Sequence, residues 1–168
     1  SKISDVGKPL ILSTGLANLN DIQFAVDTAR SQGNNDLILL QCTSLYPAPA
    51  YLSNLKAMQT MRLAFNTLVG YSDHTLGDHI AIAALTLGAC LIEKHFTLDK
   101  KMKGWDHHIS ADEQDMKILV KDSRRIFKAL GSNRRIQVES KRNVKLFRRS
   151  LIAARSIKKG EIFTDKLI

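Results

Sequence analysis

The sequence has few cysteines, no apolar run long enough to span a bilayer and no sign of a leader peptide. Its two cysteines, Cys42 and Cys90, lie in apolar runs without Cys-x-x-Cys spacing. This pattern predicts buried free thiols in a reducing compartment and argues against a disulfide or a zinc site. The apolar run 80–92 is too short to cross a membrane and is interrupted by Gly88. No basic-then-apolar leader opens the chain. We therefore expect a cytoplasmic protein without a membrane partner.

The positive charge of the chain is concentrated in one segment. The formal net charge is +9, and residues 134–149 contain seven Lys and Arg residues against one acid, Glu139. The rest of the chain is much closer to balance. Apart from Phe147, this segment lacks the interleaved aromatic side chains on which nucleic-acid bases stack. We expect a solvated connector. The alternative, a non-catalytic module that binds nucleic acid or acidic polymers through its tail, predicts binding that weakens steeply with salt.

Short apolar runs alternate with amphipathic segments of helical length along most of the chain. The expected strands are residues 9–15, 36–42, 68–72 and 89–93. The expected helices run from Asn18 or Asn20 to residue 31, and over residues 53–65, 77–87 and 112–130. Continuous apolar strands joined by helical crossovers are typical of a parallel sheet covered on both faces. Four such units form either a small open sheet or half of an eight-stranded barrel.

The positions of the polar residues favour the barrel. Polar residues occur at the carboxyl ends of the expected strands, which is where the active sites of barrels gather. They are Ser13-Thr14, Gln41 to Ser44, Ser72 to Thr75 and Glu93 to His95. A doubly wound sheet would normally carry a glycine-rich phosphate turn, and no G-x-G-x-x-G or P-loop is present. We predict an α/β fold of the (β/α)8 TIM-barrel type with about the last four β/α units in residues 1–131. A basic linker (132–148) and the start of a small second domain (149–168), with short strands at 150–154 and 157–163, would follow.

Two tetrads give the best clue to function: Ser72-Asp73-His74-Thr75 and Glu93-Lys94-His95-Phe96 each close an apolar run. Alternate residues of a strand face the same way, so the serine and the histidine of the first tetrad share a face. The glutamate and the histidine of the second tetrad do so too. If the two strands are parallel neighbours, both imidazoles reach one rim and could bind a divalent metal ion with positions left for water or substrate. The alternative is that the histidines only form hydrogen bonds with the backbone.

Other polar residues lie at the same expected rim. Glu93 could act as an acid or base or orient a sugar hydroxyl, or it could form a salt bridge with a lysine. The hydroxyls that could hold a phosphate, or instead form caps and turns, are Ser13, Thr14, Ser44 and Ser72. Asp106 lies in a loop long enough to fold over the barrel mouth, and Trp105 beside it could stack on a sugar or cover the core.

These residues resemble an ordered series of family motifs. The motifs are Ser13-Thr14-Gly15, Gln41-Cys42-Thr43-Ser44-Leu45-Tyr46-Pro47, Gly70-Tyr71-Ser72-Asp73-His74-Thr75, Glu93-Lys94-His95-Phe96 and Gly104-Trp105-Asp106-His107. They look like those of the sialic acid synthase family, which includes N-acetylneuraminate, legionaminate, pseudaminate and spore-coat polysaccharide enzymes. Residues 149–168 resemble the start of the antifreeze-like (SAF) domain of that family. Ser44 and Trp105 stand where the family often has Asn and Pro.

The resemblance implies a condensation of phosphoenolpyruvate with an N-acetylated hexosamine, such as N-acetylmannosamine, to a nine-carbon 2-keto acid and phosphate. His74 and His95 would bind Mn²⁺ or Mg²⁺ and, with Glu93, form the catalytic group. Contacts with phosphoenolpyruvate would come from Ser13, Ser44 and Ser72, and contacts with the amino sugar from Tyr46, Glu93 and Asp106. The resemblance also implies that the full-length enzyme is a homodimer. Because a barrel needs eight strands, we expect a fragment without synthase activity of its own. The enzymatic alternative is a related deoxyheptulosonate-type synthase or an aldolase.

Overall fold

The computed structural model describes residues 7–135 and 137–167. It divides the chain into two compact units, Ser1–Gly131 and Ser132–Ile168, which are considered separately below. The first unit carries the sheet and every candidate site residue.

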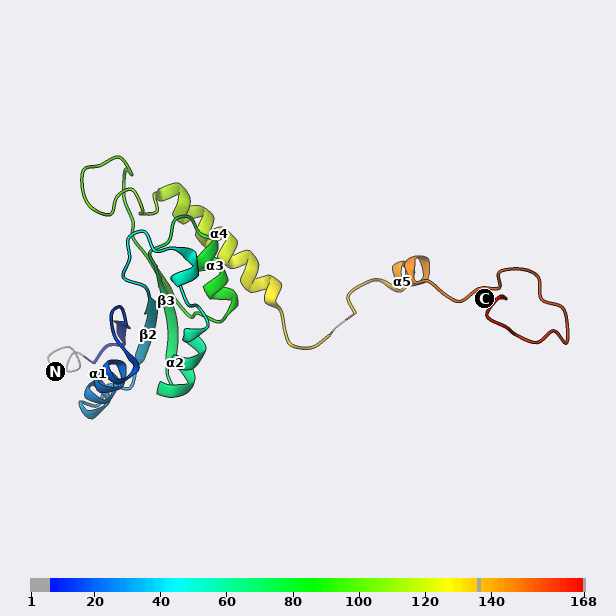
Figure 1. The fold of residues 1–168 in the computed structure, drawn as a ribbon, viewed down its shortest axis with the longest axis horizontal. Helices are drawn as coiled ribbons and strands as arrows, with labels where there is room; N and C mark the ends of the chain where they lie inside the picture. Colours follow the sequence, from blue (N-terminus) through cyan, green and yellow to red (C-terminus); the bar gives the residue numbers. More distant parts are fainter. Residues whose placement is uncertain (1–6, 136, 168) are drawn as a thin grey trace. The chain divides into compact units, whose positions relative to one another are not determined.

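The first unit contains a four-stranded sheet whose strands are all parallel (Figure 1). The strands are β1 (Leu10–Ser13), β2 (Leu37–Cys42), β3 (Leu68–Asp73) and β4 (Ile92–Lys94), and they neighbour one another in that order. A doubly wound sheet reverses its strand order at a switch point, whereas barrel strands follow one another around the sheet. The sequential order of these strands, in a curled sheet, is that of half a TIM-type barrel. The prediction of four consecutive β/α units is confirmed.

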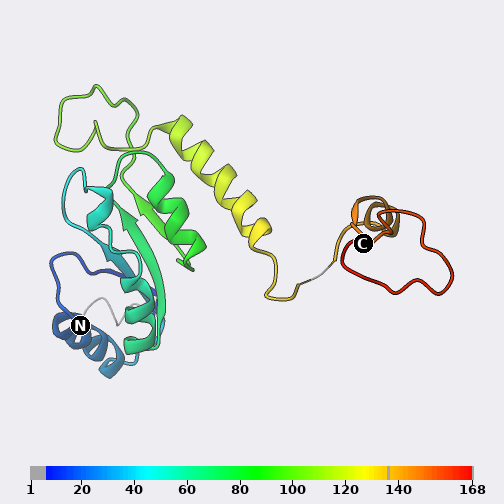
Figure 2. The ribbon, with the colours of Figure 1, turned by 45° about the vertical axis from the view of Figure 1, so that its right-hand side comes forward.

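Helices lie between consecutive strands and after the last one, and they cover one face of the sheet (Figures 1 and 2). They are α1 (Leu19–Ser31), η2 (Ala50–Leu52), α2 (Ala57–Phe65), α3 (His79–Thr86) and α4 (Glu113–Leu130). Asn18 caps α1 and Asp112 caps α4, each in a capping box with the aspartate three residues later. The second expected helix begins later than predicted, because the short 3-10 turn η2 precedes it.

The hydrophobic core lies between the sheet and these helices. On β2 and β3 it consists of alternate residues, Leu37, Leu39, Val69 and Tyr71, packed against residues of the helices such as Val26. The intervening residues face the other side of the sheet, which is the inside of the curl. That inner face leaves Ile11 and Leu68 about half exposed, at 48% and 58%. The alternation of faces decides which polar residues reach the inner rim.

The second unit differs from its prediction. The expected linker contains a short helix, α5 (Lys141–Phe147), capped by Ser140. The described part of residues 149–168 contains no strand, so the two expected strands are wrong, and nothing in this unit shows an SAF domain. Apolar side chains such as Ile152 and Phe163 are largely exposed there. A two-stranded hairpin is marginal without further strands to pack on, which is the physical reason for the difference.

The cysteine prediction needs a correction. Both cysteines are free, as expected, but Cys90 is exposed and Cys42 only partly buried. Cys90 lies in the turn before β4, outside the strand that its apolar neighbours predicted. Partial burial still raises the pKa of the Cys90 thiol. Across the described residues, none of the helices is long and apolar enough to pass through a bilayer.

Candidate active site

Parallel pairing between β3 and β4 brings the two tetrads together. Ser72 is in register with Glu93, and the Ser72 Oγ donates a hydrogen bond of 2.7 Å to Glu93 Oε1. Ser72 is fully buried, while Glu93 is exposed on the inner side of the sheet. The alternation of side chains along the strands therefore places this pair on the rim that the sequence predicts.

The two histidines lie next to each other on the same rim. The centroids of the His74 and His95 rings are 5.3 Å apart, with their planes at 77°. The Tyr46 ring packs on both, with its centroid 4.3 Å from that of His74 and 5.5 Å from that of His95. Burial raises the pKa of the Tyr46 phenol, so its hydroxyl keeps its proton at neutral pH and can donate a hydrogen bond. The juxtaposition on which the functional interpretation depends is present.

The hydrogen bonds of His74 define which of its nitrogens is free. Its Nδ1 lies 2.8 Å from the carbonyl oxygen of Thr43, which can only accept, so Nδ1 carries the hydrogen. The other nitrogen, Nε2, lies 3.5 Å from Ser72 Oγ, whose hydrogen is directed at Glu93. The Nε2 lone pair is thus left for another partner. A backbone carbonyl behind Nδ1 is the usual support of a metal-binding imidazole.

His95 lies near a carboxylate, at a distance longer than a hydrogen bond. Its Nδ1 lies 3.7 Å from Asp106 Oδ2. Asp106 belongs to the loop between β4 and α4, whose two stems are joined by a bond of 2.8 Å from the Ala111 N–H to the His95 carbonyl. His107 fixes the same loop, since its Nδ1 lies 2.8 Å from Thr97 Oγ1. The loop thus brings Asp106 to the rim, as predicted. Trp105 is 94% exposed and does not cover the core.

The donor set of the histidine pair fits a divalent metal ion. His74 directs Nδ1 at a carbonyl oxygen and keeps Nε2 available, the His95 imidazole lies beside it, and few protein ligands leave positions open to water or substrate. Within the ranges that the structure covers, however, no three or more His, Cys, Asp or Glu side chains are grouped around one possible ion position. Further ligands would therefore be water or substrate.

Two of the predicted serines, Ser13 at the end of β1 and Ser44 just after β2, form a second group around Cys42 and Gly15. Ser13 Oγ lies 3.3 Å from Cys42 Sγ. Gly15 leaves room for both neighbouring side chains, because a Cβ there would collide with Ser44 Oγ and lie 2.9 Å from Cys42 Sγ. Cys42 is in register with Ser72, so this group continues along the same rim toward Glu93 and the histidines. Thr14 instead donates to the Leu40 carbonyl and is structural.

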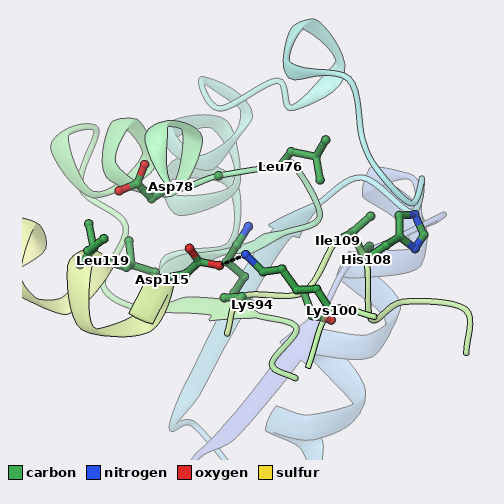
Figure 3. Close-up of a pocket in the computed structure, with 12 residues that line it drawn as sticks. Leu76, Asp78, Lys94, Lys100, His108, Ile109, Asp115 and Leu119 are labelled. Carbon is green, nitrogen blue, oxygen red and sulfur yellow. Dashed lines mark hydrogen bonds and ion pairs between the residues drawn. The ribbon is translucent and has the colours of Figure 1, made fainter. Parts of the chain in front are cut away.

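One pair of site residues was missed by the sequence reasoning. Lys94 Nζ donates to Asp73 Oδ2 at 2.8 Å, and the side chains are 4% and 0% exposed. The pair lies on the helix side of the sheet, where Lys94 helps to line a pocket of about 280 Å³ with residues such as Leu119 of α4 (Figure 3). The alternation along β3 and β4 placed Asp73 and Lys94 on one face, but their pairing required the strand register.

Comparisons with known proteins agree with this geometry. The sequence pattern of the NeuB family matches residues 1–135. The chain belongs to the NeuB family. It is 48% identical over 167 residues to the N,N'-diacetyllegionaminic acid synthase of Campylobacter jejuni subsp. jejuni serotype O:2, covering 98% of this chain and 50% of that protein. It is 39% identical over 120 residues to the N-acetylneuraminate-9-phosphate synthase of Drosophila melanogaster, covering 71% of this chain and 32% of that protein.

A solved NeuB-family relative has the same fold. The N-acetylneuraminic acid synthetase of Leptospira borgpetersenii serovar Hardjo-bovis, crystallised with citrate, superposes with a TM-score of 0.77 at 35% identity, over 86% of this chain and 50% of that one. The chain spans about half the length of the curated relatives it matches. The resemblance to sialic acid synthases is confirmed. Its relatives include proteins named as synthases of N,N'-diacetyllegionaminic acid, pseudaminic acid and N-acetylneuraminate 9-phosphate.

Proposed function

We propose that this chain forms the metal-binding half of an enzyme that condenses phosphoenolpyruvate with an N-acetylated hexosamine such as N-acetylmannosamine. The products would be a nine-carbon 2-keto acid and phosphate. The supporting observation is the convergence of His74 and His95 with Tyr46, Glu93 and Asp106 at the carboxyl ends of β3 and β4. Relatives named as synthases of N,N'-diacetyllegionaminic acid and of N-acetylneuraminate 9-phosphate support the same reaction class.

The reaction joins C3 of phosphoenolpyruvate to the aldehyde carbon of the amino sugar, and the aldehyde oxygen takes up a proton. The oxygen of a water adds to C2 with loss of one proton, which balances the proton taken up at the aldehyde oxygen. The bond from C2 to the phosphate oxygen then breaks, and the second proton of that water passes to the released phosphate as C2 becomes the keto carbon. A divalent ion, Mn²⁺ or Mg²⁺, would be held by the imidazoles of His74 and His95 and would supply Lewis acidity for the sugar aldehyde. Glu93, bonded to Ser72, is placed to move a proton at the reacting oxygens.

The remaining rim residues would bind and orient the substrates. The hydroxyls of Ser13, Ser44 and Ser72 would donate to the phosphate and carboxylate of phosphoenolpyruvate. Tyr46 and Asp106, which flank the two imidazoles, would contact the amino sugar. Positioning two reactants in this way lowers the entropic cost of their reaction.

The alternative function, an aldolase that forms a Schiff base with a lysine, is not supported. Lys94 follows Glu93 on the strand, but its ammonium is buried and bound to Asp73 and to the Thr75 carbonyl. It lies on the face opposite to the histidines. Likeness to a deoxyheptulosonate-type synthase from Thermotoga maritima, at 20% identity and a TM-score of 0.65, shows the fold alone.

Turnover, the homodimer and the SAF domain concern parts of the enzyme outside this half-barrel. An eight-stranded barrel needs four more strands than the described sheet supplies. We therefore propose that the chain alone binds the metal ion without turnover, and that the complete enzyme is a homodimer with an SAF domain. The cytoplasmic location also stays a prediction.

The proposal is tested by metal binding and by turnover. We expect the chain to bind one Mn²⁺, measured by the loss of the electron paramagnetic resonance signal of free Mn²⁺. His74→Ala should abolish binding, while His79→Ala should not, because His79 is highly exposed and lies outside the rim. Binding that survives His74→Ala would contradict the proposed site.

Turnover is tested in a chimera in which this chain replaces the aligned half of the Campylobacter jejuni synthase. We expect the chimera to release phosphate from phosphoenolpyruvate in the presence of an N-acetylated hexosamine, and the chain alone to release none. A chimera that folds and binds Mn²⁺ but shows no release with any such sugar would overturn the proposed reaction.

A further inference from the structure

The buried pair Asp73–Lys94 joins the two strand ends that carry the histidines. Asp73 is the last residue of β3 and directly precedes His74, and Lys94 is the last residue of β4 and directly precedes His95. The two residues are in register, and Lys94 Nζ lies 2.8 Å from Asp73 Oδ2. They occupy the helix side of the sheet while the histidines occupy the inner side. The pair therefore fixes the strands directly behind the imidazoles.

The contacts of the pair also fix the backbone on both sides of His74. Lys94 Nζ donates a second bond of 2.8 Å to the carbonyl oxygen of Thr75. Asp73 Oδ1 accepts the Thr75 N–H at 2.9 Å, which closes a turn around His74. The residues before and after His74 are thus both attached to the residue before His95. A change in these bonds would change the separation of the two rings.

The ionic character of the pair is not what the fold itself requires. Two buried charges lose their hydration, and well-packed apolar residues of similar size often give a protein of equal or higher stability. Pairing stabilises the charges here, because both are hydrogen-bonded and almost completely buried. What an apolar pair could not do is tie Lys94 to two specific groups at fixed distances. The chemistry of the pair is suited to setting a geometry.

We infer that Asp73 and Lys94 are positioning residues that set the His74–His95 separation needed to hold one divalent ion. This inference deepens the proposed function and rests on its two-histidine metal site. The pair acts through the backbone and would contact neither substrate nor metal. It holds in place the residues that would bind the metal ion. Loss of such supports typically weakens metal binding about 10- to 100-fold.

The test compares three variants of the 168-residue chain. Asp73→Asn combined with Lys94→Met removes both charges and the link between the strands, while the asparagine still accepts the Thr75 N–H. Asp73→Asn alone keeps the Lys94 bond to the Thr75 carbonyl and removes only half of the link. Val26→Ala is the matched control, because it creates a cavity in the core under α1, away from the histidines.

The first readout needs no metal: the nuclear Overhauser effect between the ring protons of His74 and His95. We expect this signal in the wild-type chain and in Val26→Ala, and its loss in the double variant. If the double variant fails to fold by circular dichroism, a weakened signal in folded Asp73→Asn supports the inference and an unchanged one overturns it. An unchanged signal in a folded double variant, or no signal in the wild type, also overturns it.

The second readout is the Mn²⁺ dissociation constant, which we expect to rise about 10- to 100-fold in the double variant and to stay unchanged in Val26→Ala. An unchanged constant in the double variant overturns the inference and leaves the proposed function intact. A wild-type chain that binds no Mn²⁺ counts against the metal site of the proposed function, and the ring-proton signal then decides the positioning role by itself.

Discussion

Gly70 is the position at which one added methyl group should separate β3 from β4. The residue lies in the middle of β3, two residues before Ser72, and faces the inside of the curl. A Cβ at this position would lie 2.6 Å from the carbonyl oxygen of Leu91 and 2.7 Å from Cδ2 of the buried Leu40. The Leu91 carbonyl accepts the Tyr71 N–H at 2.9 Å, which helps to hold the strands together. Gly70→Ala is therefore a test of how closely the two strands must approach.

The expected loss of stability follows from these contacts. Restoring an ordinary contact of 3.4 Å from 2.6 Å requires the Leu91 carbonyl to withdraw by about 0.8 Å. Overpacking of this kind costs about 1–3 kcal/mol in the free energy of unfolding. The reduced entropy of the unfolded chain returns about 0.4–1 kcal/mol. We expect a net destabilisation of about 1.3 kcal/mol, which is the difference between the midpoints of the two ranges.

Urea unfolding gives the overall loss, and hydrogen exchange of the Tyr71 amide shows where it arises. In Gly70→Ala, this amide should exchange faster than the global loss explains, since its acceptor has moved. Val69→Ala is the control, because Val69 is fully buried on the opposite face of the same strand and its truncation leaves a cavity instead. An unchanged free energy of unfolding in Gly70→Ala would refute the reasoning. If Gly70→Ala and Val69→Ala are equally stable, equal exchange rates of the Tyr71 amide in the two variants would refute it too.

Two predictions concern the helix caps. Asn18→Ala removes the acceptor of the Asn20 and Asp21 N–H groups and should lower the free energy of unfolding by about 0.5–2 kcal/mol in urea titrations. Asn18→Ser should keep most of the wild-type stability, because a serine hydroxyl can also accept these bonds. The hydrogen bond from the Asp115 N–H, followed by the contact with Lys100, lowers the pKa of Asp112. Its stabilising effect on α4 should be complete above the unfolded pKa of 3.8 and disappear as the pH falls through the lower folded pKa. Asp112→Asn keeps a capping side chain that does not titrate. The difference in urea midpoint between this variant and the wild type should therefore shrink as the pH falls. A difference that stays constant at all pH values would show that ionisation of Asp112 does not contribute to stability.

The order of the elements could be predicted from the sequence because it depends on local patterns. Continuous apolar runs marked the four strands, and Asn18 or Asn20 marked the start of α1, of which the structure selects Asn18. The pattern failed where local propensity lacked tertiary support. The apolar residues around Ile152 and Phe163 predicted strands, yet these side chains have no sheet to cover them in the described second unit.

The sequence by itself determined which residues share a face, since alternation along a strand is a property of the backbone. It therefore placed Ser72 with His74, and Glu93 with His95, before any strand was paired. Only the tertiary structure decided the register between β3 and β4, because pairing depends on contacts between segments far apart in the chain. That register places Ser72 beside Glu93, and the folded chain brings Tyr46 onto both imidazoles. It also couples Asp73 to Lys94, a pair that no pattern in either tetrad revealed.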